Sequence, residues 1–225
     1  MKIAILISGQ PRFLNSRAYK TIKEKLLDVY NCDVYCHFWW NPNGGYYSTS
    51  PWSTLGNFPI PKDADKKIEE LYKPIKYTWE LPTNIKTNYT KTINMNNNIN
   101  LPSMYLSMKK SFDLIENINQ YEWIIRLRYD DILTSFPNLN LLDKNIDLYV
   151  PDYREYHNLI GNNCLIMNSK AAKCIMNIYD NIDFIYNNNI IFNDEQFITF
   201  WIMYNKLKYI IINKQDFFVE LQRTE

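Results

Sequence analysis

The chain has 225 residues, and its 25 Lys and Arg are matched by 24 Asp and Glu, for a formal net charge of +1. This length suits one large domain that buries most of its apolar surface. Because no long run carries one sign of charge, the sequence lacks the electrostatic features of a nucleic-acid-binding protein or a polybasic membrane surface. A small-molecule ligand is therefore expected.

The first residues, MKIAILISGQPRF, begin with a lysine and an apolar stretch. The stretch ends at Ser8 and Gly9, which is too short for the hydrophobic region of a signal peptide, and no small-residue cleavage site follows. No apolar run approaches the roughly 18 residues that span a bilayer. We expect a cytoplasmic protein, of the producing or the host cell, with no membrane span.

Four cysteines are too few for a disulfide scaffold in a chain of this length, and we expect reduced packing residues at Cys32, Cys36, Cys164 and Cys174. Cys32, Cys36 and His37 resemble a set of zinc ligands. They lie in a predicted strand, however, whose alternation sends neighbouring side chains to opposite faces. We therefore expect no zinc site.

The run KIAILIS, residues 2–8, is continuously apolar and rich in β-branched residues, which predicts a parallel strand covered on both faces. Gly9 ends this strand. A helix is predicted over residues 16–30, with Ser16 as the N-cap, and a second strand over residues 33–39. In such a unit the turn at Gly9 falls at the carboxyl end of the strand, where open α/β sheets bind ligands.

Residues 41–61 read as a long loop, and such loops in compact domains are commonly functional. A helix is predicted over residues 62–72. Its first turn holds Asp63 and Asp65, which match a D-x-D pattern. We interpret these acids as ones that the helix dipole favours at this end.

Strands and helices continue to alternate along the rest of the chain. The predicted elements are a strand (75–81), a surface excursion (82–102), a helix with Ser103 as N-cap (103–120), a charged strand (124–130), a strand (146–153), a hairpin arm (162–168), two helices (169–182 and 193–207) and a last strand (208–213). This order predicts an α/β fold, with a mainly parallel central sheet flanked by helices.

The stretch IIRLRYDDIL, residues 124–133, sets two arginines and two adjacent aspartates among residues typical of a buried strand. Charged groups are rarely buried unless they are paired or hold a metal or ligand. Strand alternation puts a row of charged side chains on one face, about 7 Å apart at each step: Arg126, Arg128 and Asp130. The strand is predicted to end near Asp130, which places Asp130 and Asp131 at the ligand edge of the sheet.

Two interpretations fit this row. In the first, Asp130 and Asp131 hold Mg²⁺ or Mn²⁺, hard cations that take oxygen ligands and bridge nucleotide phosphates, and Arg128 pairs with a carboxylate or phosphate. In the second, Arg128 and Asp130 form an ion pair, Arg126 pairs elsewhere and Asp131 caps the turn. The position at the ligand edge, and a further basic residue at Arg12, favour the first.

Four short segments occur in a characteristic order: ISGQPRF, DVYCHFWW, SMYLSMKKSFDLI and WIIRLRYDDIL. With them the chain resembles the small GT-A-type glycosyltransferases of viral and bacterial surface-glycan clusters. The resemblance implies a single Rossmann-like GT-A domain over residues 1–225, in which residues 1–133 bind a nucleotide-diphosphate sugar, such as a UDP- or GDP-sugar, and residues 134–225 face the acceptor. It further implies Mn²⁺ or Mg²⁺ at a D-x-D-like motif and transfer of the sugar to a hydroxyl of a glycan or another acceptor.

The same resemblance implies roles for individual residues. Asp130 corresponds to the metal and diphosphate aspartate and Asp131 to its neighbour, but no residue separates the two, so metal-independent action stays open. The implied contacts with the nucleotide or sugar are Ser8, Gly9, Gln10, Arg12, His37, Trp39, Ser103, Ser107, Lys110 and Arg128. Gly9 as a simple turn, His37 as a structural histidine and Lys110 as a solvated lysine stay open as alternatives.

An inverting transferase needs a carboxylate that deprotonates the acceptor hydroxyl. The candidates are Asp194 and Glu195, which also read as the acidic first turn of a helix capped by Asn193. His157 is a further possible ligand or acceptor contact. A nucleotidyltransferase and a non-catalytic sugar-nucleotide-binding module remain the alternative functions.

Overall fold

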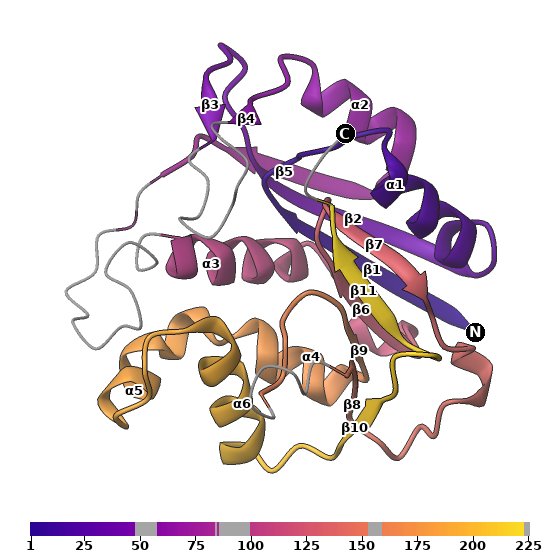
Figure 1. The fold of residues 1–225 in the computed structure, drawn as a ribbon, viewed down its shortest axis with the longest axis vertical. Helices are drawn as coiled ribbons and strands as arrows, with labels where there is room; N and C mark the ends of the chain where they lie inside the picture. The colour runs from indigo at the N-terminus through magenta and orange to yellow at the C-terminus, as the bar shows by residue number, and fades with distance from the viewer. Residues whose placement is uncertain (48–57, 84, 86–99, 153–158, 223–225) are drawn as a thin grey trace.

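The computed structural model describes residues 1–47, 58–83, 85, 100–152 and 159–222. A seven-stranded sheet in the order β10-β8-β9-β6-β1-β2-β5 forms its centre (Figure 1). The strands are β1 (Lys2–Gly9), β2 (Asn31–Trp39), β5 (Lys76–Glu80), β6 (Trp123–Leu127), β8 (Leu148–Pro151), β9 (Leu165–Met167) and β10 (Tyr209–Ile212). All neighbours pair in parallel except β9, which runs antiparallel to β6 and β8. The predicted α/β class with a mainly parallel sheet is confirmed.

Helices cover both faces of this sheet, and two small ribbons complete the fold. The helices are α1 (Arg17–Ile22), continued by a π-helical turn (Lys23–Leu27), α2 (Ala64–Tyr72), α3 (Asn100–Asp113), α4 (Ser169–Met176), α5 (Ile182–Asn187) and α6 (Asp194–Tyr204). The ribbons are antiparallel: β7 (Asp131–Ser135) with β11 (Phe218–Leu221), and β3 (Tyr46–Tyr47) with β4 (Phe58–Pro59). None of the helices in the described part of the chain has the length and apolar content that crossing a bilayer requires.

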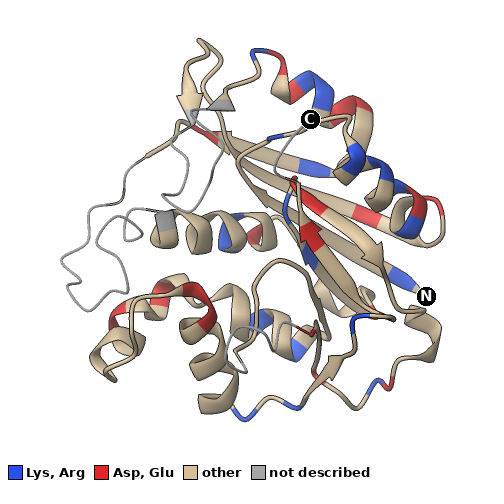
Figure 2. Ribbon diagram, viewed as in Figure 1, with Lys and Arg blue, Asp and Glu red and all other residues tan. Residues whose placement is uncertain are grey.

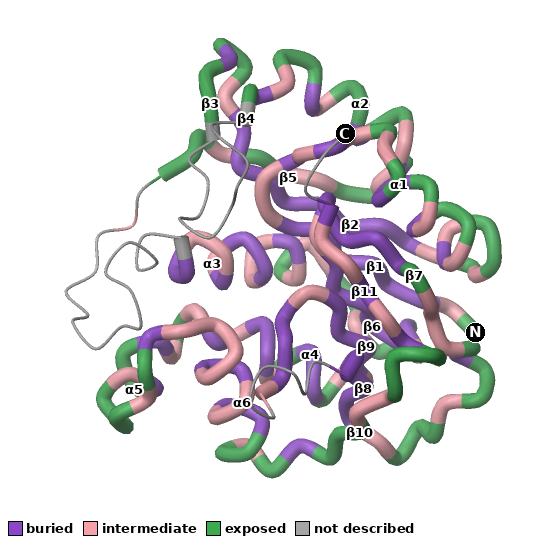
Figure 3. Tube along the Cα trace, in the orientation of Figure 1, coloured by how far each residue is buried: buried purple, intermediate pink, exposed green. Residues whose placement is uncertain are grey.

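Alternation along the strands divides the core into two clusters. In β1, Ile3, Ile5 and Ile7 face α1, α2 and the β7–β11 ribbon, while Ala4 and Leu6 face α3, α4 and α6. Figure 3 shows the central strands as almost continuously buried. The continuous apolar runs in the sequence therefore reflect helix cover on both sides.

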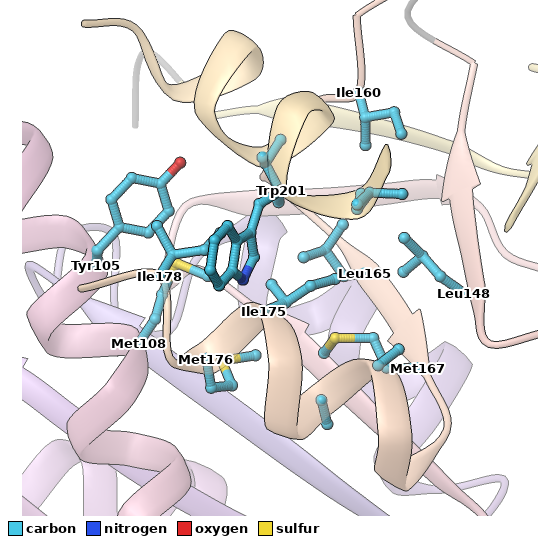
Figure 4. Packing of buried hydrophobic residues seen from close by; sticks show 14 of the residues in the cluster. Tyr105, Met108, Leu148, Ile160, Leu165, Met167, Ile175, Met176, Ile178 and Trp201 are labelled. Carbon is cyan, nitrogen blue, oxygen red and sulfur yellow. The ribbon is translucent and has the colours of Figure 1, made fainter. Parts of the chain in front are cut away.

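The second cluster joins α3, α4 and α6. Figure 4 shows Trp201 of α6 beside Ile175 and Met176 of α4, with Tyr105 and Met108 of α3 on the other side. The Trp201 indole N–H donates to the carbonyl of Cys174, 3.0 Å away, so its polar atom is satisfied inside the cluster. This packing fixes where the first turn of α6 lies.

The outer helices carry many of the charged residues. Figure 2 shows basic residues on α1 and both basic and acidic residues on α2. Asp63 precedes α2 and pairs with Lys67 at 3.1 Å, and Asp65 lies in its first turn. The interpretation of these acids as helix-end residues is confirmed.

One helix start differs from the prediction, and Ser16 is the N-cap residue of α1 as expected but makes no side-chain capping bond. α3 begins at Asn100, so Ser103 lies inside it and its hydroxyl donates to the carbonyl of Thr83 at 3.1 Å. Ser16 precedes α1, but its hydroxyl donates to the Gln222 side chain at 2.8 Å. Asn193 is the N-cap of α6, as expected, and accepts from the backbone N–H of Gln196 at 3.0 Å.

The charged stretch is where the predicted strand boundary is wrong. β6 ends at Leu127, and β7 begins at Asp131 as the partner of β11. The intervening turn closes because the backbone N–H of Arg128 donates to Asp131 Oδ2 at 2.8 Å. We call residues 128–131 the acidic turn. Tyr129 lies in the first core cluster with Leu127, on the face that alternation predicts.

Candidate functional site

The candidate site lies where the parallel strands end. Ser8 of β1 is the register partner of His37 in β2, and Ile7 is the partner of Leu127, the last residue of β6. The turn after β1, the end of β2 and the acidic turn therefore meet at one edge of the sheet. In open α/β sheets this edge binds ligands.

The first loop combines an open backbone with a buried hydroxyl. Gly9 has φ +118°, a conformation that favours glycine, and a Cβ built there meets no heavy atom within 4 Å. Ser8 is buried, and its Oγ has no hydrogen-bond partner among the described residues. The Arg12 guanidinium donates to the side-chain oxygen of Gln10. The backbone at Gly9 therefore leaves space for a ligand, with a buried hydroxyl one residue before it.

His37 is fully buried and faces α3. Its Nδ1 lies 2.6 Å from Ser107 Oγ, and its Nε2 has no partner among the described residues. Burial lowers the pKa of His37 to about 4, so the imidazole is neutral near pH 7. The Trp39 ring lies edge-on at 5.0 Å, and its indole N–H donates to the carbonyl of Ser103 at 3.2 Å.

Three residues of α3 are expected at the site, and the structure brings two of them, Ser103 and Ser107, together with His37 and Trp39. The third, Lys110, forms an ion pair with Glu80 at the end of β5. Both charges act on His37, Lys110 lowering and Glu80 raising its pKa, so they lie near the same edge of the sheet. The Lys110 side chain is 31% exposed, so a contact with the nucleotide and the alternative of a solvated lysine both stay predictions.

Arg128 and Asp130 form a two-bond ion pair across the acidic turn. Arg128 Nε lies 2.7 Å from Asp130 Oδ1, and Nη2 lies 2.9 Å from Oδ2. The Asp130 side chain is 6% exposed and the Arg128 side chain 28%. Burial lowers the pKa of Arg128, but Asp130, with a smaller part from Asp131, outweighs it, and the net shift is upward.

Asp131 lies beneath this pair, with no exposed surface. Its Oδ2 accepts the Arg128 backbone N–H, and its Oδ1 has no partner among the described residues. Burial raises the pKa of Asp131 to about 7; Arg128 opposes the shift and the charge of Asp130 adds to it. Its position is that of the turn cap in the ion-pair interpretation.

Arg126 connects β6 to the start of α6. It is buried, and its Nη1 donates to the carbonyls of Asn162 and, at 3.0 Å, Asn163. Burial lowers its pKa to about 10, so it stays charged near pH 7. Asn162 Nδ2 in turn donates to Asp194 Oδ2 at 2.7 Å. Asn162 therefore links Arg126 to Asp194, through its backbone carbonyl on one side and its side chain on the other.

Asp194 and Glu195 lie in the first turn of α6, both half-buried, and we call them the acid pair. Burial, together with a hydrogen bond to Asp194 and its charge, raises the pKa of Glu195 to about 8. Asp194 also raises the pKa of Arg128, so the acid pair lies within electrostatic reach of the acidic turn. The two interpretations of these acids, helix end and site, are therefore compatible.

The expected Mg²⁺ or Mn²⁺ fits this arrangement poorly. Both oxygens of Asp130 are held by Arg128, and Asp131 has no exposed surface. Over the described ranges, no three His, Cys, Asp or Glu side chains gather as a metal site. Hard cations need several oxygen lone pairs directed at the ion. The assignment of a metal to Asp130 and Asp131 stays a prediction.

Comparison with solved structures gives the fold. The chain superposes on a glycosyltransferase involved in glycosylation of the major capsid of PBCV-1 with a TM-score of 0.51, over 95% of this chain and 83% of that one, at 12% identity. It superposes equally well, with a TM-score of 0.51, on an active-site mutant of LgtC, over 96% of this chain and 74% of the other, at 11% identity. This is the GT-A glycosyltransferase fold.

The GT-A fold is recognised from structure alone. No model of a protein family matches the chain, and no curated protein matches its sequence. At these identities the likeness establishes the fold, and the chemistry must be argued from the side chains of this chain.

Two residues of the GT-A edge were missed in the sequence. Asn162 carries the link from Arg126 to Asp194. Gln222 is buried after β11; its backbone N–H donates to the Asp130 carbonyl at 2.7 Å, and its Oε1 accepts from Ser16 and from the backbone of Ala18. Neither lies in a motif, so no local signal marks them. His157 lies outside the described residues.

Proposed function

We propose that this chain is a glycosyltransferase that moves a sugar from a nucleotide-diphosphate sugar to an acceptor hydroxyl. The observation that carries the proposal is the meeting of three features at one edge of a GT-A fold. These are the open first loop at Gly9, the charged acidic turn, and an acid pair on α6 with one raised pKa. Perturbed carboxyl groups at the ligand edge are typical of sites that transfer protons.

In this proposal the chain has a half that binds the sugar donor and a half that faces the acceptor. Residues 1–133 would hold the nucleotide and diphosphate, with Ser8 and Arg128 among the contacts. Residues 134–225 would supply the acid pair beside the acceptor. Surface-glycan synthesis in the cytoplasm is part of the same proposal.

The acid pair would act as the general base. Glu195 keeps its proton near pH 7 because its pKa is about 8, and we assign the base to Asp194, whose Oδ2 accepts from Asn162 Nδ2 at 2.7 Å and is thereby oriented. As the bond from the anomeric carbon to the diphosphate oxygen breaks, its electron pair leaves with the nucleoside diphosphate. The acceptor oxygen bonds to that carbon and passes its proton to Asp194.

The test is release of nucleoside diphosphate from UDP- and GDP-sugars, with and without glycan acceptors. We expect acceptor-dependent release that falls by about 10²- to 10⁴-fold in Asp194→Asn, the range for loss of a general base. Asp183→Asn is the matched control, because Asp183 lies on neighbouring α5 outside the acid pair. Donor binding without turnover in any acceptor mixture would instead identify a sugar-nucleotide-binding module.

A further inference from the structure

The side chains of the acidic turn are layered. Asp131 has no exposed surface, the Asp130 side chain is 6% exposed, and the Arg128 side chain above them is 28% exposed. A ligand approaching this edge of the sheet therefore meets a guanidinium before it meets either carboxylate. An anion is attracted by that surface, whereas a divalent cation is repelled by it.

The formal charges of the turn also disfavour a second cation. Two guanidiniums, Arg126 and Arg128, lie beside the carboxyl groups of Asp130 and Asp131, so this group of four side chains carries no net negative charge to attract a cation. A divalent ion would have to displace Arg128 from both oxygens of Asp130 and reach under it to Asp131. A largely buried carboxylate that already has a two-bond partner is costly to separate from that partner.

We propose that Arg128, oriented by Asp130, binds the diphosphate of the donor directly and fills the role of a divalent cation in this chain. The inference rests on the proposed function and goes beyond it by naming the group that stabilises the leaving diphosphate. The contact with Asp130 uses two of the five N–H groups of the guanidinium, which leaves three for phosphate oxygens. A fixed, partly buried cation is suited to charge that develops on a leaving group.

The first measurement needs no nucleotide. Mn²⁺ is titrated into the purified chain, and free Mn²⁺ is followed by electron paramagnetic resonance. We expect binding weaker than about 1 mM in the unchanged chain and a gain of at least about tenfold in Arg128→Met, where Asp130 is released. Micromolar Mn²⁺ binding by the unchanged chain that Asp130→Asn abolishes would overturn the proposal.

The second measurement is calorimetric binding of UDP and GDP, each with EDTA and with Mn²⁺. We expect one of them to bind with EDTA and Mn²⁺ changing its affinity less than about twofold, because the guanidinium is built in. In Arg128→Met the affinity in EDTA should fall by about 10- to 100-fold, the worth of charged hydrogen bonds, and Mn²⁺ should restore part of it. Binding by the unchanged chain that depends on Mn²⁺ would overturn the proposal.

Two variants separate charge from folding. Arg128→Lys keeps the charge and loses the two-bond geometry, so its affinity should lie between those of the unchanged chain and Arg128→Met. Arg17→Met removes the same charge from a side chain that is 66% exposed, and it should change neither titration. No binding of either diphosphate in any condition would overturn the proposed function together with this inference, an outcome distinct from Mn²⁺-dependent binding.

Discussion

At the scale of single residues, burial sets the charge of each group at the candidate site. His37, Asp131 and Glu195 all lose water, and each pKa shifts toward the neutral form. Arg126 and Arg128 stay charged, because Arg126 Nη1 donates to two backbone carbonyls and Asp130 holds Arg128. Near pH 7 the site therefore combines two fixed guanidinium cations with a neutral imidazole at His37 and a protonated Glu195.

Glu195 should make stability depend on pH. Its pKa is about 8 in the folded chain against about 4.3 for an ordinary Glu. Because the folded pKa is the higher one, the contribution to stability is complete below about pH 4 and is lost as the pH rises through about 8. Glu195→Gln imitates the protonated form and lacks this loss.

Urea denaturation of both chains between about pH 5 and pH 8 checks this prediction. The stability of Glu195→Gln relative to the unchanged chain should grow with pH, by about 1.4 kcal/mol per unit at most. Asp131 titrates in the same window but is present in both chains, so its effect cancels. A difference that does not vary with pH would contradict the raised pKa of Glu195.

At the scale of elements, the β7–β11 ribbon holds the acidic turn against the first helix. Leu221 pairs with Asp131 across the ribbon, and Gln222 then bonds to the carbonyl of Asp130 and to the start of α1. The acidic turn is thus held by three parts of the chain: by β6 before it, by β7 after it, and by Gln222 directly after β11. The relative positions of Arg128 and Asp130 depend on all three.

Gln222→Ala tests this link. It removes the acceptor of two hydrogen bonds and leaves a buried backbone N–H at Ala18, so we expect a loss of about 1–3 kcal/mol in the free energy of unfolding. As a positioning residue, Gln222 should also alter donor KM more than kcat. Gln215→Ala is the control, because Gln215 is exposed. Equal effects of the two changes on stability and KM would refute the role.

At the scale of the whole molecule, two core clusters hold helices on both faces of one sheet. The second cluster places α6, and with it the acid pair, against α3 and α4. Tyr105 of α3 reinforces this placement, since its hydroxyl donates to the carbonyl of Asp194 at 3.0 Å. The position of the acid pair is thus determined by packing remote from the edge of the sheet.

Ile175→Ala should weaken this support. Ile175 has no exposed surface and lies in the cluster of Figure 4, so the cavity should lower the free energy of unfolding by about 2–5 kcal/mol. Ile75→Ala, at a residue that is 55% exposed, should change it by less than about 0.5 kcal/mol. Thermal and urea unfolding measure both. A small loss at Ile175 would mean that the site collapses around the change.

The fold could be predicted because its signals are local. The apolar run of β1, the alternation of strands with helices and the Asn193 cap depend on neighbouring residues. The end of β6 could not, because Ile132 and Leu133 continue the apolar pattern while the chain turns back as β7. Long-range hydrogen bonds leave no pattern in the sequence either. Ser16 and Gln222, which share one, are 206 positions apart.

The hydrogen bond from Gln222 to Asp130 has a consequence for biosynthesis. Residues 1–131 leave the ribosome well before residue 222 has been added, so β1, β2 and β6 can pair while the carbonyl of Asp130 still faces water. The nascent polypeptide would pair these three strands first and complete the ligand edge last. Translation thus separates folding of the scaffold from maturation of its chemistry.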